Sequence, residues 1–355
     1  MTRGEQIKTT KTLVLATVLF LTPPGCTTVR VPASTDLTQQ LRQRAMRCLK
    51  AGIRYPHNAV VRAEAVEAME SGDRKQTLPW IRTALLDEHP AVRFAACIAI
   101  GNATDGVADA AIAKRLSDEH ASVRVAALYA RHRLGHSNRT GTIITYLLEH
   151  KDAAVRRNAA LVLGLLGETS AIKVLARAIR DADAGVRHHV LEAMARLGNS
   201  EARQELTFMT SAGVGSDEVF AINALAATRD TRYVDTFRYK LATAIHLETR
   251  LAAARGLGLM GIDEGYDVAM RALTRSRPTF KDTEDPPAGQ VLRAKQLGAS
   301  ALGAIGRRSA LGALVKQMDS ENDPRIRLSA ARAVLNILGA RQRDTNPFAP
   351  TTKED

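Results

Sequence analysis

The residues of this chain whose types and spacing could do chemistry begin with a glycine motif. Residues 256–261 read GLGLMG and match the G-x-G-x-x-G pattern that cradles the pyrophosphate of a dinucleotide. That chemistry requires a strand before the motif and a helix that starts at it. Gly258 instead falls inside a predicted helix, and Gly261 falls where that helix should end. We therefore expect no cofactor at this motif.

The nine histidines are the next candidates, because imidazoles are common metal ligands. His188 and His189 are adjacent on a predicted helix and point in different directions, and a glycine separates the other close pair, His132 and His136. Three more occupy predicted helix starts: His89, His120 and His246. A metal site needs three or four convergent ligands, so no metal site is predicted. The chain also lacks the P-loop, G-x-S-x-G and Cys-x-x-Cys motifs, and we assign no catalytic residue.

The elements that must position these residues follow from an arginine that recurs with a nearly constant spacing. The column arginines, as we call them, are Arg62, Arg93, Arg124, Arg156, Arg187, Arg250, Arg293 and Arg327. Phe220 stands in the one slot without an arginine, and the spacings between slots are 30 to 34 residues, with one of 43. Such a period indicates stacked units that are each too small to bury a core alone.

Each unit is predicted to be a helix, a short turn and a second helix. Four residues before the arginine stand mostly N-cap types such as Asn58 and Asp152, and eleven residues after it stand glycines such as Gly167 that can end a helix. Apolar residues recur three and four apart, and no stretch shows the period-two alternation of a strand. The sequence therefore predicts an all-α fold, an α-solenoid of about nine helix–turn–helix repeats over residues 58–340.

Two segments carry a family resemblance. KDAAVRRNAALVLGLLGETSAIKVLARAI (151–179) and DADAGVRHHVLEAMARLGNSEARQEL (181–206) resemble HEAT repeats, which are armadillo-like helical units, and are most similar to the variety first named for phycobilisome (PBS) lyases. The resemblance implies that the column arginines are structural and that Asp152, Asp183 and Asp323 join them in tying adjacent units together. Phe220 and an insertion at residues 277–289 depart from the repeat, and the insertion reads as a surface loop.

One enzyme of the wider family can be set aside by its residues. Deoxyhypusine hydroxylase is a HEAT-like di-iron protein that uses His-Glu pairs, and this chain contains no His-Glu dipeptide. Its metal ligands therefore cannot be carried over. Bilin lyase activity is also poorly supported, since only the type of repeat matches and a fold alone does not establish a function.

The two ends of the chain lie outside the repeats. Residues 1–25 combine basic residues, a short apolar run and a Pro-Pro-Gly ending, which is the layout of a secretory signal peptide. Cys26 then resembles the lipid attachment residue of a bacterial lipoprotein; simple cleavage and an uncleaved anchor are the alternatives. We interpret residues 26–36 as a tether, 37–54 as a helix that caps the open end of a solenoid domain 37–340, and 341–355 as a disordered tail.

The formal net charge of +13 favours an anionic partner. An export signal argues against nucleic acid and favours an anionic lipid or polymer, or another envelope protein. The second helices of HEAT-like arrays usually line the concave side, so their basic residues form a candidate binding face: Lys114, Arg115, Arg177, Arg180, Arg271 and Arg275. Arginines used inside the structure or on solvated faces are the alternative explanation of the charge.

Two further cysteines have different environments. Cys97 shares a column with apolar residues and is predicted to lie in the core. Cys48 lies on the first helix without an evident partner. A Cys48–Cys97 disulfide is possible in an oxidising compartment and stays open.

These observations predict a non-enzymatic scaffold of the cell envelope. We expect a monomer, held to a bacterial membrane on its periplasmic side by a lipid on Cys26, that binds an envelope protein or an anionic polymer through the solenoid surface. Whether the inner or the outer membrane holds it stays open. The alternative is a HEAT-like enzyme or cofactor-handling protein, bilin-lyase-like or oxidoreductase-like, with a site near the irregular repeats 216–290. A third interpretation is a structural spacer without a ligand.

Overall fold

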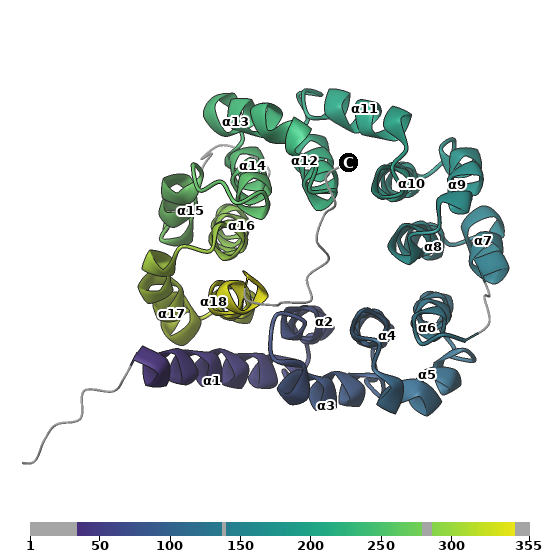
Figure 1. Cartoon of the computed structure of the whole chain (residues 1–355), viewed down its shortest axis with the longest axis horizontal. Coiled ribbons are helices and arrows are strands. Elements are labelled where there is room, and N and C mark those ends of the chain that lie inside the picture. Colours follow the sequence, from purple (N-terminus) through teal and green to yellow (C-terminus); the bar gives the residue numbers. More distant parts are fainter. Residues whose placement is uncertain (1–33, 137–139, 279–285, 345–355) are drawn as a thin grey trace, which may run out of the picture.

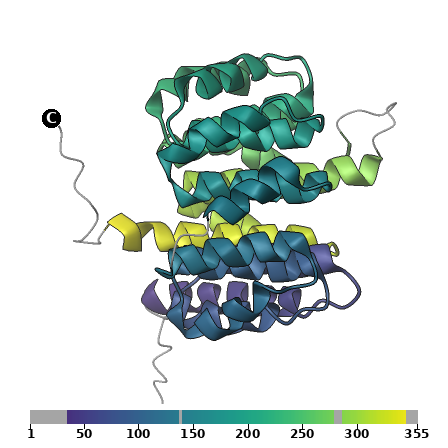
Figure 2. The same ribbon diagram turned by 90° about the vertical axis from the view of Figure 1, so that its right-hand side faces the viewer.

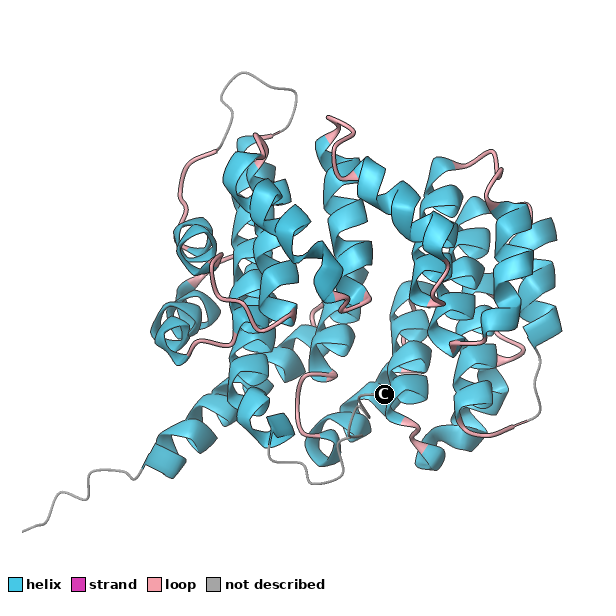
Figure 3. Cartoon of the chain, turned by 45° about the horizontal axis from the view of Figure 1, so that its top comes forward, coloured by secondary structure: helices cyan, strands magenta, loops and turns pink. Residues whose placement is uncertain are grey.

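The computed structural model describes residues 34–136, 140–278 and 286–344. These ranges form eighteen α-helices and four short 3-10 turns, and they contain no strand (Figure 3). The predicted all-α fold is therefore confirmed. The signal peptide, Cys26 and most of the tether fall on residues 1–33, outside the described residues.

The helices form two concentric layers around a ring (Figure 1). The inner layer consists of α2 (Ala59–Met69), α4 (Pro90–Ala103), α6 (Ala121–Arg133), α8 (Ala153–Leu166), α10 (Ala184–Arg196), α12 (Gly215–Ala227), α14 (Leu247–Leu259), α16 (Pro287–Ile305) and α18 (Pro324–Asp344). The outer layer consists of α1 (Ser34–Ile53), α3 (Arg74–Ala84), α5 (Asp109–Arg115), α7 (Thr140–Glu149), α9 (Ile172–Ala178), α11 (Ser200–Met209), α13 (Val234–Thr243), α15 (Tyr266–Leu273) and α17 (Leu311–Ser320). Successive inner helices pack side by side, and the units stack with roughly parallel helices (Figure 2).

Local sequence signals set the helix ends. The side chain of Asn58 accepts hydrogen bonds from the backbone N–H groups of Val60 and Val61, at 3.1 and 3.2 Å, and so caps the start of α2. Gly167 and Gly261 follow α8 and α14 with φ values of +78° and +80°, a conformation that glycine adopts without steric cost. Caps of this kind begin the first helix of a unit, and these glycines end it.

The first helix closes the solenoid into a ring. No second helix follows α18 within the described residues, and α1 packs on α18 in the outer layer, between α17 and α3 (Figure 1). In the inner layer α18 also contacts α2. The prediction that this helix caps an open end is therefore wrong, because α1 joins the last unit to the first.

Hydrogen bonds and an ion pair accompany the closing contact. The Nη2 atom of Arg42 donates to the carbonyl oxygen of Leu338 at 2.9 Å, and Arg44 forms an ion pair with Asp319. Leu49 of α1 is fully buried. Burying one leucine side chain contributes about 1.5–3 kcal/mol, so apolar burial supplies more of the closing energy than the half-exposed ion pair.

The column arginines bind the turns between the units. Arg62, Arg93 and Arg156 each form two hydrogen bonds, of 2.7 to 2.9 Å, to the carboxylate that lies 25 residues later in the chain. The three carboxylates belong to Asp87, Asp118 and Asp181. Arg93, Arg124, Arg156 and Arg187 also donate to carbonyl oxygens in the turn before their own helix. Each such arginine therefore fixes the turn before its own helix. Where it also forms a bidentate pair with the carboxylate 25 residues later, it fixes the turn before the next unit as well.

The aspartates that tie the units differ from those the resemblance implied. Asp152 and Asp183 cap α8 and α10 through backbone N–H groups, and Asp323 pairs with Arg325 two residues away. The N-cap needs a side-chain oxygen that turns back onto its own helix. The carboxylate two residues earlier, such as Asp181, is the one that faces the preceding arginine.

Small residues let the inner helices approach closely. A Cβ atom on Gly303 of α16 would lie 2.9 Å from the Cα atom of Ala333 in α18. A Cβ atom on Gly258 of α14 would lie 2.7 Å from the backbone nitrogen of Ile305 in α16. These contacts explain the GLGLMG motif, since Gly258 packs a helix pair and Gly261 ends a helix.

Several predicted boundaries move. α1 begins at Ser34, inside the predicted tether, and α18 extends to Asp344, inside the predicted tail. The loop predicted at residues 277–289 ends by 286, because Pro287 starts α16; residues 279–285 and 345–355 lie outside the described residues. None of the helices in the described ranges combines the length and apolarity needed to cross a bilayer.

The two cysteines of the described chain are unbonded. Cys48 and Cys97 are both free thiols, buried in α1 and α4. Burial raises the pKa of Cys48 to about 11 and that of Cys97 to about 12. Both therefore act as small core residues, and the disulfide left open by the sequence is absent from these described residues.

Candidate binding cavity at the centre of the ring

The candidate functional site is a cavity of about 1340 Å³ inside the ring. Five inner helices bound it: α2, α12, α14, α16 and α18. It therefore lies in the part of the ring where the last units meet the first (Figure 1). Small-molecule pockets are typically roughly 300–1000 Å³, so this cavity has room for a larger ligand.

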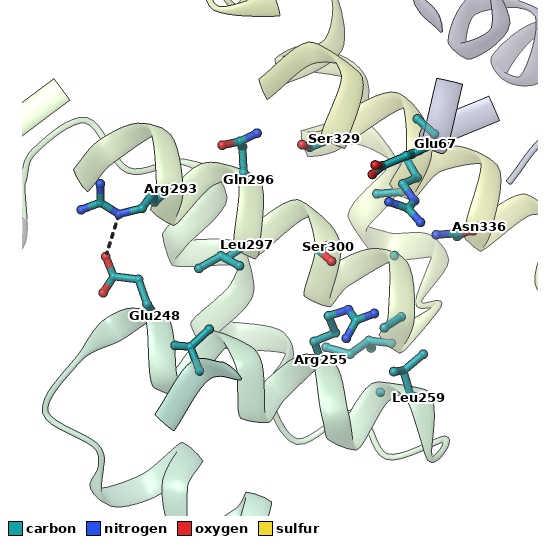
Figure 4. A pocket seen from close by; sticks show the side chains of 18 of the residues that line it. Glu67, Glu248, Arg255, Leu259, Arg293, Gln296, Leu297, Ser300, Ser329 and Asn336 are labelled. Carbon is teal, nitrogen blue, oxygen red and sulfur yellow. Dashed lines mark ion pairs between the residues drawn. The ribbon is translucent and has the colours of Figure 1, made fainter. Parts of the chain in front are cut away.

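Polar side chains form stripes along two of the bounding helices. Gln296 and Ser300 are four residues apart on α16, and Ser329, Arg332 and Asn336 are three and four residues apart on α18. Residues with these spacings share one helical face, and Figure 4 shows four of them around the same space. The opposite faces of both helices lie in the hydrophobic core. The same amphipathic pattern thus places apolar side chains of α16 and α18 in the core and their polar side chains in the cavity.

Apolar side chains and one ion pair complete the wall. Leu259 and Leu297 face the cavity together with the polar groups (Figure 4). The Nε atom of Arg293 lies 3.7 Å from Oε1 of Glu248 on the neighbouring helix α14. The cavity therefore offers polar, apolar and charged surface within one enclosure.

Arg255 is the most confined charge in the cavity. Its Nη1 atom donates to Oδ1 of Asn223 at 3.1 Å, an uncharged acceptor on α12. Burial lowers the pKa of the Arg255 guanidinium, and the positive charges of Arg332 and Arg196 lower it further. The charge of this side chain is therefore poorly compensated by the surrounding protein.

Two carboxylates of α2 face the same space. Burial raises the pKa of Glu67, and the nearby positive charge of Arg332 opposes that rise. Burial likewise raises the pKa of Glu64, against the effects of Arg325 and of a hydrogen bond from Gln296. The side chain of Glu67 is exposed, but it is exposed into the cavity within the ring, so the neighbouring helices still limit its hydration.

The predicted basic face lies elsewhere. Lys114, Arg115, Arg177, Arg180, Arg271 and Arg275 lie on or directly after α5, α9 and α15. These helices belong to the outer layer, so the expectation that the second helices line the concave side is wrong (Figure 1). Arg115 pairs with Asp118 at 3.0 Å, and Arg275 donates to the carbonyl oxygen of Pro278. The helices that carry the column arginines line the inside instead.

The irregular units border the cavity. Phe220 on α12 stacks on His188 of α10 with ring centroids 4.8 Å apart, so an aromatic contact to the preceding unit replaces the arginine. Three helices that bound the cavity overlap the predicted region, residues 216–290. α14 lies within it, α12 begins one residue before it, and α16 begins at Pro287 and continues beyond it. The region singled out from the sequence thus contributes part of the cavity wall, and α2, α18 and most of α16 supply the rest.

The histidines make separate contacts. Nε2 of His136 lies 2.8 Å from Oδ1 of Asp109, and Nε2 of His132 lies 3.5 Å from Oε1 of Glu168. No group of three or more His, Cys, Asp or Glu side chains within the described ranges is arranged to hold a metal ion. The structure thus assigns these imidazoles to pairwise surface contacts.

Comparison with known proteins identifies the class of the repeats. Residues 48–131 and 142–213 match the model of HEAT repeats, and the chain therefore contains HEAT repeats. The cavity lies mostly beyond the matched residues, on α12 to α18. No curated protein matches the sequence.

Solved structures resemble the chain at low identity. Human deoxyhypusine hydroxylase, in complex with glycerol, is 15% identical, with a TM-score of 0.36, over 86% of this chain and 98% of that one. The complex of CpcE and CpcF of phycocyanin lyase from Nostoc sp. PCC7120 is 17% identical, with a TM-score of 0.35, over 74% of this chain and 94% of that one. At these TM-scores neither likeness carries a conclusion about this chain.

Sequence reasoning missed the charges of the cavity. Glu67, Arg255 and Arg332 each stand five residues after a column arginine. The same position is apolar or aromatic at Ile98 and Tyr129, but it also carries Glu192, which does not line the cavity. A charged residue at this repeat position therefore did not by itself mark the cavity.

Proposed function

We propose that this protein is a non-enzymatic binding scaffold that holds a segment of a partner protein in the central cavity. The observation that carries the proposal is the cavity of about 1340 Å³, which is bounded by the inner helices α2, α12, α14, α16 and α18 and is open to solvent. A rigid ring presents its contacts in place, so binding loses little conformational entropy on the side of the scaffold.

The composition of the wall favours a polypeptide ligand. Hydroxyl and amide side chains such as Ser300, Gln296 and Asn336 can pair with a peptide backbone, and Leu259 and Leu297 can cover apolar side chains. Ser329 donates to the carbonyl oxygen of Arg325 at 2.9 Å, which favours a structural use of that hydroxyl over a nucleophilic one.

Blocking the cavity tests this function. Ser300→Trp places an indole in the cavity, while Thr145→Trp adds the same bulk to an exposed position of the outer helix α7. Partner proteins captured by affinity pull-down from the native cell envelope should be lost with Ser300→Trp and kept with Thr145→Trp. Equal capture by both variants, with unchanged circular dichroism, would reject the cavity as the binding site.

The same proposal includes a lipid anchor on Cys26 that holds the scaffold to a bacterial membrane, on the periplasmic side. The sequence pattern around Cys26 supports it. Seven residues, 27–33, separate Cys26 from α1, a distance of up to about 25 Å in an extended chain. Because α1 lies in the outer layer, a tether there leaves the cavity accessible (Figure 1).

Metabolic labelling with a palmitate analogue tests the anchor. The wild-type protein should incorporate the label and sediment with membranes, and Cys26→Ser should do neither. Full labelling of Cys26→Ser would show that another residue, or no lipid, holds the protein.

A further inference from the structure

Arg255 differs from the arginines that bind the turns. Arg62, Arg93 and Arg156 each face a carboxylate through two hydrogen bonds. Arg255 has a single hydrogen bond, to the amide of Asn223, and no ion pair within the described part of the chain. A guanidinium carries five N–H donors, so most of its capacity is unused. An incompletely paired charge in a confined site is costly, and an anionic ligand would relieve that cost.

Arg332 extends the unused positive charge along the cavity. It stands on α18, is exposed to the interior of the ring and has no hydrogen bond or ion pair within the described ranges. Its charge acts on both Arg255 and Glu67, so it lies near both groups. Asn336, one turn further along α18, adds a polar group beside them (Figure 4).

The chemistry of these groups fits a carboxylate. Guanidinium donors bind planar carboxylates in bidentate geometry, and the serine hydroxyl of Ser300 can donate one more hydrogen bond. In Figure 4 the side chain of Arg255 lies below Ser300 and extends toward the side of the cavity where Asn336 lies. A carboxylate between the two arginines would neutralise charge that the protein leaves uncompensated.

Negative charges in the same cavity decide the class of ligand. Glu64, Glu67 and Glu248 line the same cavity, so a continuous polyanion such as a nucleic acid would meet like charges along its length. A polypeptide can place acidic side chains at the arginines and neutral, apolar or basic ones elsewhere. The cavity is also larger than a free inorganic anion needs, and the three leucines in its lining favour a ligand with apolar groups.

We propose that Arg255 and Arg332 form a carboxylate-binding subsite for an acidic polypeptide segment in the central cavity. This inference rests on the proposed function and specifies the chemistry of its ligand. Ser300 and Asn336 complete the subsite with uncharged groups.

A labelled peptide tests the subsite directly. The probe is a fluorescein-labelled hexapeptide with two adjacent glutamates and neutral or apolar residues at the other positions, used at low ionic strength, with binding followed by fluorescence anisotropy. Arg255→Gln and Arg332→Gln should each weaken binding by about tenfold, an effect of about 1.4 kcal/mol. The matched control is the pair Arg180→Gln and Arg271→Gln, which removes exposed arginines of the outer surface and should leave the affinity within about twofold.

The variants separate the possible outcomes. If Ser300→Trp abolishes binding but Arg255→Gln and Arg332→Gln do not weaken it, the cavity binds peptides and the carboxylate subsite is wrong. If the outer control weakens binding as much as the inner variants, the attraction is nonspecific and the subsite is again wrong. Inorganic phosphate, added at the same concentration of negative charge as the labelled peptide, should not displace it. Displacement would identify a simple anion site and overturn the acidic peptide as the ligand.

One competing occupant lies in the chain itself. Residues 345–355 follow α18 and contain Glu354 and Asp355, so two carboxylates are covalently linked to a helix that lines the cavity. Removing residues 345–355 should leave the affinity for the glutamate peptide unchanged if the ligand is a separate polypeptide. An increase of about tenfold or more on truncation would show that the tail competes for the subsite and would overturn an external segment as its principal ligand.

Discussion

The Nη2 atom of Arg42 lies 2.9 Å from the carbonyl oxygen of Leu338, which follows it by 296 residues. This hydrogen bond joins the first described helix to the last one. The contact completes the outer layer over α18 and turns a repeat array into a ring. The cavity exists because of this closure, since α2 and α18 both contribute to its wall.

Closure should depend on the apolar face of α1. Leu49 is fully buried, so Leu49→Ala should lower the free energy of unfolding by about 2–5 kcal/mol. Leu37, on the same helix, is 56% exposed, and Leu37→Ala should change it by less than about 0.5 kcal/mol. Chemical denaturation followed by circular dichroism measures both. Equal effects of the two substitutions would contradict the packing of α1 described above.

Close helix approach in the inner layer should make Gly303 sensitive to one methyl group. A Cβ atom there would lie 2.9 Å from a backbone atom of α18, so Gly303→Ala should destabilise the fold by about 1–3 kcal/mol. Gly312 in α17 has no neighbour within 4 Å of the same atom, and Gly312→Ala should stabilise by about 0.5 kcal/mol. Thermal melts of the two variants should therefore shift in opposite directions, and a shared direction would argue against the helix spacing.

The Arg156–Asp181 pair should give stability that depends on pH. Its hydrogen bonds from Arg156 hold the pKa of Asp181 below the usual value of an aspartate. A carboxyl whose pKa is lowered by folding stabilises the protein above its unfolded pKa, and that contribution is lost as the pH falls through the lower folded value. Asp181→Asn should therefore cost about 1–3 kcal/mol at pH 7.

Asp181→Asn also tests the direction in which stability changes with pH. Unfolding of wild type and Asp181→Asn by urea should differ at pH 7 and converge below about pH 3.9, the value for an unperturbed aspartate. Asp217→Asn, at an aspartate of α12 outside the arginine–aspartate pairs, is the control and should follow wild type. A difference that persists undiminished in acid would mean that packing, and not the charge, explains the loss.

Mild acid should strengthen binding of an acidic ligand in the cavity. Confinement raises the pKa of Glu67, so this carboxyl takes up a proton sooner than ordinary glutamates as the pH falls. Loss of its negative charge removes a repulsion between Glu67 and an acidic ligand at Arg332. As the pH is lowered from neutral, the affinity for the glutamate peptide should therefore begin to rise before ordinary glutamates take up protons, and Glu67→Gln should bind tightly with little change over the same range. An affinity that is flat in wild type would contradict the role given to Glu67.

Much of the fold could be predicted because the repeat is local. The spacing of the arginines, the caps at Asn58 and Asp152, and the glycine after α8 each act within one unit, where sequence distance and spatial distance agree. The helices and the turn of each unit can therefore be predicted from the sequence of that unit alone.

The aspartate partners were harder to predict. Asp183 and Asp181 are two residues apart, and only the direction of the turn decides that Asp183 caps its own helix while Asp181 faces Arg156. The prediction of which helices form the inner layer was wrong for a related reason. The amphipathic pattern shows which face of a helix is buried, but it does not show which helix of a unit lies on the inside of the curve.

The sequence by itself determined the helices, their pairing into units and the repeated arginine that joins them, because these depend on contacts between neighbouring residues and neighbouring units. Only the tertiary structure decided that the array closes, that the helices with the column arginines face the centre, and that Arg255 and Arg332 share a cavity with Glu67. The physical reason is that closure depends on small rotations that accumulate along the array. A small rotation at each unit interface adds up over the whole solenoid, and the final position of α18 beside α1 depends on the sum of all these rotations.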